Sequence, residues 1–255
     1  AEEIGQGAKP FIAAGVLDGA ERVFGLHTAH DLRSGTVGLK PGLNNAAVDH
    51  FRIEVHGKST HVSTPHLGTD ALYIASQIVV AVQGLVTRMT SPTEPVIIGI
   101  GCLNAGTTYN AVAEHAVMEG TTRTVSQESR DRIRRLVTET ADSIAAIYGG
   151  TAEIVWTDFA AALINDAEVC REAAAVADSL LGEGHVVTDR ELSLSGDNFA
   201  EFELYRPGAY AYLGTGNPDK PHTVVSNHNG GFDVDEDALV TGAALYAGYA
   251  LARLG

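Results

Sequence analysis

The sequence predicts a mixed α/β protein in which one α/β domain is interrupted by a second, inserted domain. Three observations support this fold class: strict alternation of apolar and polar residues that begins near Asp49, a strand-helix-strand-strand-helix-strand order that follows it, and a return to alternating helix and strand further on. We therefore assign residues 46–160 to the inserted domain, and residues 1–45 and 161–255 to the first domain.

Composition excludes several classes of partner. The 255 residues are 45% hydrophobic, as in ordinary globular proteins, and no segment is of low complexity. Asp and Glu (32) outnumber Lys and Arg (17), and a net charge of -15 repels phosphate backbones and anionic lipids, so we expect neither a nucleic acid nor a membrane partner. Cys102 and Cys170 fall in segments that we interpret as buried, which suits a reducing, cytoplasmic location.

The first domain opens with residue types that suit a metal site. The adjacent carboxylates Glu2 and Glu3 are followed by the strand-like run 23–26, which we expect to end at His27. A hydrolytic zinc centre needs a carboxylate ligand, imidazole ligands and a second carboxylate as a base. The alternatives are a solvated acidic end and an ordinary strand-end histidine. The abrupt start, with no lead-in element, predicts that part of this fold precedes Ala1.

The inserted domain begins with a half-exposed strand and a helix. Phe51, Ile53 and Val55 alternate with polar residues, which is the period of a strand with one buried face. Thr69 is the expected N-cap of a helix that ends before Pro92. The apolar residues of this helix recur at three- and four-residue spacing: Leu72, Ala75, Ile78, Val79, Val82, Leu85, Val86 and Met89.

Two further strands and a second helix complete the inserted domain. Residues 96–103 and 116–125 are predicted strands joined by the loop 106–110, and Ser126 is the expected N-cap of the next helix. Its run of arginines, Arg130, Arg132, Arg134 and Arg135, is interpreted as a solvated helix face. With a last strand at 152–157, the order predicts a ferredoxin-like sheet with helices on one face.

The remaining residues return to helix and strand. We expect a helix at 166–181, a strand at 209–213 and a final helix from Glu236, which complete the first domain.

Short motifs occur in a fixed order along the chain. They are Ala1-Glu2-Glu3, Phe24-Gly25-Leu26-His27, Gly57-Lys58-x-x-His61, Gly106-Thr107-Thr108-Tyr109-Asn110, Gly120-Thr121-Thr122-Arg123-Thr124 and His228-Asn229-Gly230-Gly231-Phe232. In this order the chain resembles the metal-dependent aminoacylase and amidohydrolase branch of the zinc carboxypeptidase superfamily, which includes hippurate hydrolases and indole-acetyl-amino-acid hydrolases. The resemblance implies a catalytic α/β domain, incomplete at its N-terminus, interrupted by a ferredoxin-like lid domain that also forms a homodimer.

The resemblance also implies roles for individual residues. Glu2 would be the general base, while Glu3, His27 and His228 would bind a divalent metal, zinc or manganese, with two metals per subunit in the complete family site. Without the family pattern, His30 competes with His27, and His222 with His228. The remaining histidines are interpreted as surface or structural residues: His50, His56, His66, His115 and His185.

Three further residues match positions that act on the substrate in this family. His61 would stabilise the oxyanion in the active site of a partner subunit, and Asn110 and Arg123 would bind the substrate, with Arg123 as a clamp for its free carboxylate. The alternatives are a loop turn stabilised by Asn110 and a cross-strand ion pair made by Arg123.

Two departures from the family pattern limit this interpretation. The family takes two more metal ligands from a Cys-Gly-His segment upstream of the Glu pair, which these residues do not contain, and Asp197-Asn198-Phe199 stands where relatives usually have Glu-Asp-Phe. We expect a metal-dependent amidohydrolase that cleaves N-acyl-amino acids. The alternatives are a truncated, non-catalytic homologue that dimerises and binds ligand, and a related exopeptidase or desuccinylase.

Overall fold

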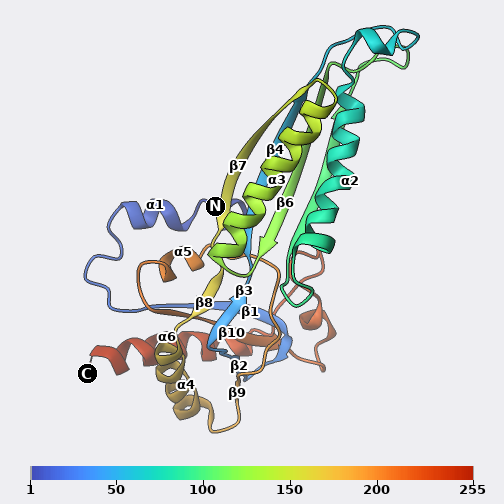
Figure 1. Cartoon of the computed structure of the whole chain (residues 1–255). Coiled ribbons are helices and arrows are strands. Elements are labelled where there is room, and N and C mark those ends of the chain that lie inside the picture. Colours follow the sequence, from blue (N-terminus) through green and yellow to red (C-terminus); the bar gives the residue numbers. More distant parts are fainter. Residues whose placement is uncertain (1, 255) are drawn as a thin grey trace. The chain divides into compact units, whose positions relative to one another are not determined.

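The chain forms two compact units in a computed structural model that describes residues 2–254, without the side chain of Glu3 (Figure 1). Unit 1 comprises residues 1–45, 163–193 and 197–255, and unit 2 comprises residues 46–162 and 194–196. The predicted boundaries lie after residues 45 and 160. The mixed α/β class is confirmed by the helices and sheets of both units. The catalytic and lid roles of the two units stay predictions.

Unit 1 is built around a four-stranded sheet with the order β1-β10-β2-β9, in which β1 and β10 are parallel. Helices α4 and α6 contact each other and β10, and their apolar faces form a core with the sheet. The elements of unit 1 are η1 (Glu2–Ile4), α1 (Ala8–Ala13), β1 (Val23–Arg33), β2 (Val37–Gly38), β3 (Gly42–Asn45), β8 (Leu163–Asn165), α4 (Ala167–Leu181), β9 (Val186–Val187), α5 (Ala200–Glu203), β10 (Gly208–Gly216), η3 (Pro221–Val224) and α6 (Asp237–Leu254).

Unit 2 is an antiparallel sheet with the order β5-β6-β4-β7, and α2 and α3 pack on one face of it (Figure 1). This is the connectivity of the split β-α-β fold that the sequence predicts. The elements of unit 2 are β4 (Ala47–His56), η2 (Pro65–Leu67), α2 (Ala71–Met89), β5 (Ile97–Ala105), β6 (His115–Thr124), α3 (Gln127–Ile147) and β7 (Thr151–Ala160).

The alternation in β4 sorts its side chains between the two faces of the sheet. Phe51, Ile53 and Val55 are fully buried in the core formed with α2 and α3, whereas Arg52 and Glu54 between them are partly exposed. Helix α2 is long and apolar enough to cross a membrane, but six of its residues are buried inside unit 2, as in the core helix of a globular domain.

The caps of the two helices in unit 2 correct one prediction and confirm another. Asp70, and not Thr69, caps α2, because its carboxylate accepts hydrogen bonds from the backbone N–H groups of Leu72 and Tyr73. Ser126 caps α3 as predicted, with its hydroxyl accepting from the N–H of Ser129.

The arginine run on α3 is not uniformly solvated, so that prediction is wrong for its first member. Arg130 is 5% exposed, because it lies one turn before the buried Ile133 and faces β4. There it donates to both carboxylate oxygens of Asp49, at 2.9 and 2.6 Å, and Asp49 is 1% exposed. Unit 2 therefore contains a buried, bidentate ion pair.

Cys102 is also placed differently from the prediction. Cys170 is buried, but Cys102 is exposed, because an irregularity in β5 between Ile100 and Cys102 shifts the register and turns Cys102 to the face that carries Glu119. Both cysteines are free thiols.

Candidate metal centre

The predicted base and the first predicted ligand lie in η1 of unit 1. The backbone of Glu2 and Glu3 forms this single helical turn, and the N–H of Gly5 donates to the carbonyl of Glu2 at 2.8 Å. The side chain of Glu3 lies outside the described residues, so its role as a ligand stays a prediction.

His27 lies in the middle of β1 and not at the end of a strand as predicted, because β1 continues to Arg33 alongside β10. Its ring is partly buried, and Nδ1 lies 2.7 Å from the carbonyl oxygen of Thr28. Since a carbonyl can only accept, Nδ1 must carry the proton, which leaves the lone pair of Nε2 available. Metal-binding histidines are typically held in this way by a backbone carbonyl.

Tyr210 connects His27 to the carboxylates of this region. Its ring centroid lies 6.0 Å from that of His27, and its hydroxyl donates to Asp197. Burial, together with the negative charges of Asp197 and Glu2, raises the pKa of the Tyr210 hydroxyl. Glu2 therefore lies close enough to the tyrosine to act on it electrostatically, and it shares this neighbour with His27.

Sequence reasoning singled out Asp197 and Asn198 only as a departure from the family pattern. Asp197 also accepts from the backbone N–H of Phe199 at 2.7 Å. Asn198 is buried, and its Nδ2 has no hydrogen-bond partner among the described residues. A β-carbon added to Gly7 would lie 3.0 Å from this nitrogen. A buried, unpartnered N–H suits a carboxylate or carbonyl oxygen as its partner.

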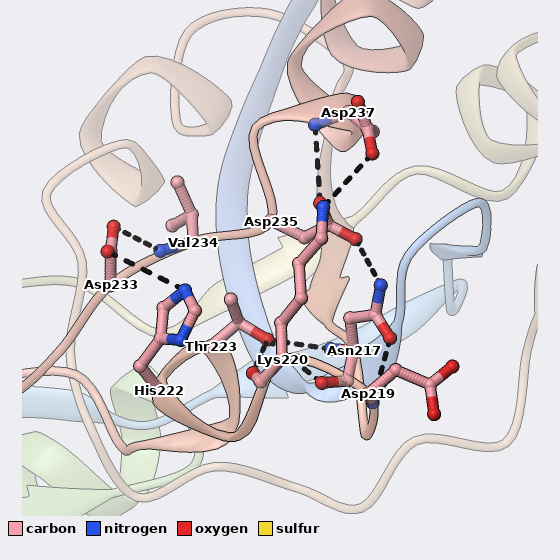
Figure 2. Close-up of polar contacts among 9 residues, drawn as sticks. All are labelled: Asn217, Asp219, Lys220, His222, Thr223, Asp233, Val234, Asp235 and Asp237. Carbon is pink, nitrogen blue, oxygen red and sulfur yellow. Dashed lines mark hydrogen bonds and ion pairs between the residues drawn. The ribbon is translucent and has the colours of Figure 1, made fainter.

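The loop that carries His228 is anchored at both ends by a polar network (Figure 2). Before the loop, Lys220 donates to Asp235 at 2.6 Å and to Asp237 at 3.1 Å, and Asn217 donates to the second oxygen of Asp235 at 2.8 Å. These hydrogen bonds lower the pKa of the Asp235 carboxyl below its usual range and raise that of Lys220. The two ends of the loop are therefore held together.

A second contact holds the same loop against β1. His30 donates from Nδ1 to the side-chain oxygen of Asn227 at 3.1 Å, so the residue before His228 is tied to the strand that carries His27. His228 is exposed and has a φ of 63°, and among the described residues no other non-glycine has a positive φ. His222 is exposed, 4.0 Å from Asp233. The choice of His27 and His228 as ligands stays a prediction, but His30 is already engaged in holding the loop.

His61 and Asn110 lie next to each other in unit 2. His61 forms an isolated β-bridge with Ala111, and the N–H of Val62 donates to the carbonyl of Asn110 at 3.2 Å. The His61 ring is exposed, with Nδ1 2.7 Å from the hydroxyl of Ser63. Gly57 permits this loop, because an added β-carbon would lie 2.2 Å from the carbonyl oxygen of Thr69.

Arg123 lies at the other end of β6 from His115. It is partly buried, and burial lowers the pKa of its guanidinium. Its Nη1 donates to the carbonyl of Leu194 at 3.4 Å, which is long for a hydrogen bond. This contact uses only one of the five N–H donors of the guanidinium. Such a group is suited to binding an anion.

Residues 1–252 match the model of peptidase family M20/M25/M40. The chain belongs to this family. Among solved structures, it resembles a dinuclear metal-binding M20 peptidase of Bacillus subtilis with a TM-score of 0.80 and 32% identity, covering 98% of this chain and 62% of that one.

Three curated relatives are enzymes by name. The N-acetyl-L-cysteine deacetylase of Bacillus subtilis is 36% identical over 240 residues, 94% of this chain and 56% of the relative. Thermostable carboxypeptidase 1 of Saccharolobus solfataricus is 36% identical over 242 residues, 94% of this chain and 60% of the relative. The N-acetyldiaminopimelate deacetylase of Bacillus velezensis is 30% identical over 252 residues, 98% of this chain and 65% of the relative. The chain thus spans 56 to 65% of the length of these relatives.

Proposed function

We propose that the protein is a metal-dependent amidohydrolase that cleaves the amide bond of N-acyl-amino acids. Membership of the M20 family and the names of two deacetylases among its relatives support this reaction. The structural observation that carries the proposal is the hydrogen bond from His27 Nδ1 to the Thr28 carbonyl, which presents Nε2 as a ligand.

The residue types assigned to the site in unit 1 suit a divalent metal. Glu3, His27 and His228 would hold zinc or manganese, because one carboxylate with two imidazoles is a common ligand set for such ions. When bound, the metal supplies Lewis acidity, which polarises the substrate carbonyl and makes a water easier to deprotonate. The contact between His30 and Asn227 and the pairing of Lys220 with Asp235 keep the His228 loop in place.

Glu2 would be the general base. Its neighbour Tyr210 donates a hydrogen bond to Asp197, and the negative charges of Glu2 and Asp197 both act on the Tyr210 hydroxyl. A carboxylate beside the attacking water can accept its proton. His61 would donate a hydrogen bond to the oxyanion that forms at the attacked carbonyl. In this proposal His61 acts in the active site of a partner subunit, so the enzyme is a homodimer joined through unit 2.

Arg123 and Asn110 would recognise the substrate. A guanidinium that burial has partly stripped of water gains more from pairing with the free carboxylate of an acyl-amino acid than one in solution does. Asn110 offers an exposed amide beside His61, where it can contact the acyl group.

An exopeptidase is the second candidate, because a carboxypeptidase is among the relatives. Both reactions hydrolyse an amide whose nitrogen belongs to an amino acid with a free carboxylate, so they differ in the acyl group, which is an aminoacyl or peptidyl group for the exopeptidase. A panel of N-acetyl-amino acids and dipeptides separates them.

The decisive experiment measures release of free amino acid from N-acetylcysteine and other N-acetyl-amino acids by the protein supplied with Zn²⁺ or Mn²⁺. Loss of a general base costs about 10²- to 10⁴-fold in rate, so Glu2→Gln should lose at least two orders of magnitude. Glu183→Gln, an exposed carboxylate in the loop after α4, is the matched control and should keep the rate. Full activity of Glu2→Gln, or activity unchanged after metal is removed by a chelator, would refute the proposal.

A further inference from the structure

Three side chains in unit 2 form a second cluster of potential metal ligands, in a different unit from the centre described above. Glu54 and His56 lie on β4, and His115 lies opposite His56 on β6. Because Phe51, Ile53 and Val55 face the helices, Glu54 and His56 project from the opposite, open face of the sheet. His115, the cross-strand partner of His56, is exposed on that same face.

The ligand atoms of these residues are already close together. One from each of the three lies within 4.8 Å of the others, and His115 Nε2 is 3.2 Å from a carboxylate oxygen of Glu54. The rings of His56 and His115 have their centroids 5.3 Å apart. Two ligand atoms bound to one tetrahedral ion at about 2.0–2.2 Å are about 3.3–3.6 Å apart, so side-chain rotations that shorten these separations by about 1 Å would bring all three onto one cation.

A cross-strand ion pair alone does not account for this arrangement. Pairing of Glu54 with His115 needs only one imidazole, yet His56 stands beside them and its described contact is with the His115 ring. Arg52 contacts the other oxygen of Glu54, but it also lies 3.9 Å from Glu119, so its positive charge is shared between two carboxylates. Glu54 is thus left with one oxygen directed at the two histidines.

We propose that Glu54, His56 and His115 form a binding site for Zn²⁺ or a similar borderline divalent cation, with a position left open to solvent. Two imidazoles and a carboxylate are typical zinc ligands, and imidazole ligands favour zinc, copper and nickel over magnesium and calcium. Because the ligands come from neighbouring strands of one sheet, their backbone positions are fixed before the ion binds.

The position of the site gives it a structural consequence. His56 is the last residue of β4 and His115 is the first of β6, and the N–H of Gly57 donates to the carbonyl of Glu114 at 2.8 Å. A bound ion would cross-link the two strands where the loop that carries His61 begins, and it would therefore stiffen the base of that loop.

The experiment measures, by elemental analysis, the number of Zn²⁺ ions bound per chain of the intact protein after equilibrium dialysis. MgCl₂ is the competing salt. His115→Ala and His56→Gln should each bind one Zn²⁺ fewer per chain at low micromolar free zinc. The affinity of the cluster for Zn²⁺ should be at least about tenfold weaker in each variant, because loss of a group that only orients a ligand already lowers metal affinity about 10- to 100-fold. His50→Ala is the matched control: it lies on the same face of β4, about 20 Å along the strand, and contacts Glu119.

Two further readouts separate this site from the proposed catalytic centre. The same difference of one Zn²⁺ between the parent and His115→Ala should persist in a His27→Ala background. Saturating Zn²⁺ should raise the unfolding temperature reported by Trp156, which is in unit 2, in the parent and in His50→Ala but not in His115→Ala. Unchanged zinc content in both cluster variants, equal loss in His50→Ala, or displacement of this Zn²⁺ by millimolar Mg²⁺ would overturn the proposal.

Discussion

The buried ion pair between Arg130 and Asp49 should be essential to the stability of unit 2. Replacing Arg130 with Met leaves the Asp49 carboxylate, 1% exposed, without the two hydrogen bonds of 2.9 and 2.6 Å that compensate its burial. Breaking a buried pair from one side costs about 3–5 kcal/mol. Arg134 on the same helix is already paired with Asp158 at 2.6 Å, so it does not replace Arg130 as the partner of Asp49.

The assay is urea unfolding followed by fluorescence. Trp156 is the only tryptophan of the chain and packs on Phe51, so its emission reports unit 2 alone. With a urea dependence of about 2 kcal/mol/M, a loss of 3–5 kcal/mol lowers the midpoint by about 1.5–2.5 M. Arg135→Met is the control on the same helix. Its partner Glu139 is an exposed i,i+4 neighbour, and such a pair is worth about 0.3–0.5 kcal/mol.

A double variant tests the reasoning behind this number. Asp49→Leu combined with Arg130→Met removes both charges, so it should be more stable than Arg130→Met alone. Two results would refute this reasoning. In the first, the free energy of unfolding of Arg130→Met lies within about 1 kcal/mol of the parent value, as that of Arg135→Met should. In the second, the double variant loses as much free energy of unfolding as the two single variants together.

Other perturbations have equally defined outcomes. Burial raises the pKa of Glu203 from 4.5 to about 7, so between these pH values the folded state holds a proton that the unfolded state has lost. The free energy of unfolding should therefore fall by about 3 kcal/mol as the pH rises across this window. Glu203→Gln should remove this pH dependence, and an unchanged dependence would exclude Glu203 as its source. Asp70→Ala should destabilise unit 2 by about 1 kcal/mol in the Trp156 assay through loss of the α2 cap, and a change below 0.3 kcal/mol would show that the cap contributes little. Arg123→Ala should raise KM for N-acyl-amino acids far more than it lowers kcat, and a purely structural role would instead appear as lost stability with unchanged KM. His61→Ala should lower kcat about 10²- to 10³-fold, and mixing it with Glu2→Gln should restore part of the activity if the sites are shared between subunits; no recovery in a verified mixed dimer would exclude sharing.

Periodic patterns made most of the fold predictable from the sequence. Phe51, Ile53 and Val55 specify the buried face of β4 because a strand alternates its side chains, and the spacing of Ala75, Ile78 and Val82 places one face of α2 in the core. These patterns involve residues that are close in the sequence, so they can be recognised without the tertiary structure.

Features that depend on contacts distant in sequence were not predictable in the same way. Arg130 seemed solvated in a run of charged residues, because its partner Asp49 is 81 positions away. Strand β1 extends past His27 because β10, far along the chain, pairs with it. The cluster of Glu54, His56 and His115 needs the register of β4 against β6, which the sequence does not give.

The residue types of Glu2, Glu3 and His27 indicated a metal site, but only the order of the motifs favoured His228 over His222. A histidine such as His27 carries no sign in the sequence that Nδ1 will meet the carbonyl of Thr28. Asp197 and Tyr210 were recognisable as partners only in the structure, because their hydrogen bond joins a loop to the first half of β10.

The central claim is that Glu3, His27 and His228 bind one divalent cation beside Glu2. The most direct measurement is anomalous X-ray diffraction from crystals of the protein grown with Zn²⁺, recorded on both sides of the zinc absorption edge. We predict an anomalous peak bonded to His27 Nε2, His228 and the Glu3 carboxylate, with Glu2 adjacent to it. A His27 Nε2 without a metal in crystals that carry zinc elsewhere, or a His228 turned away from the peak, would contradict the account.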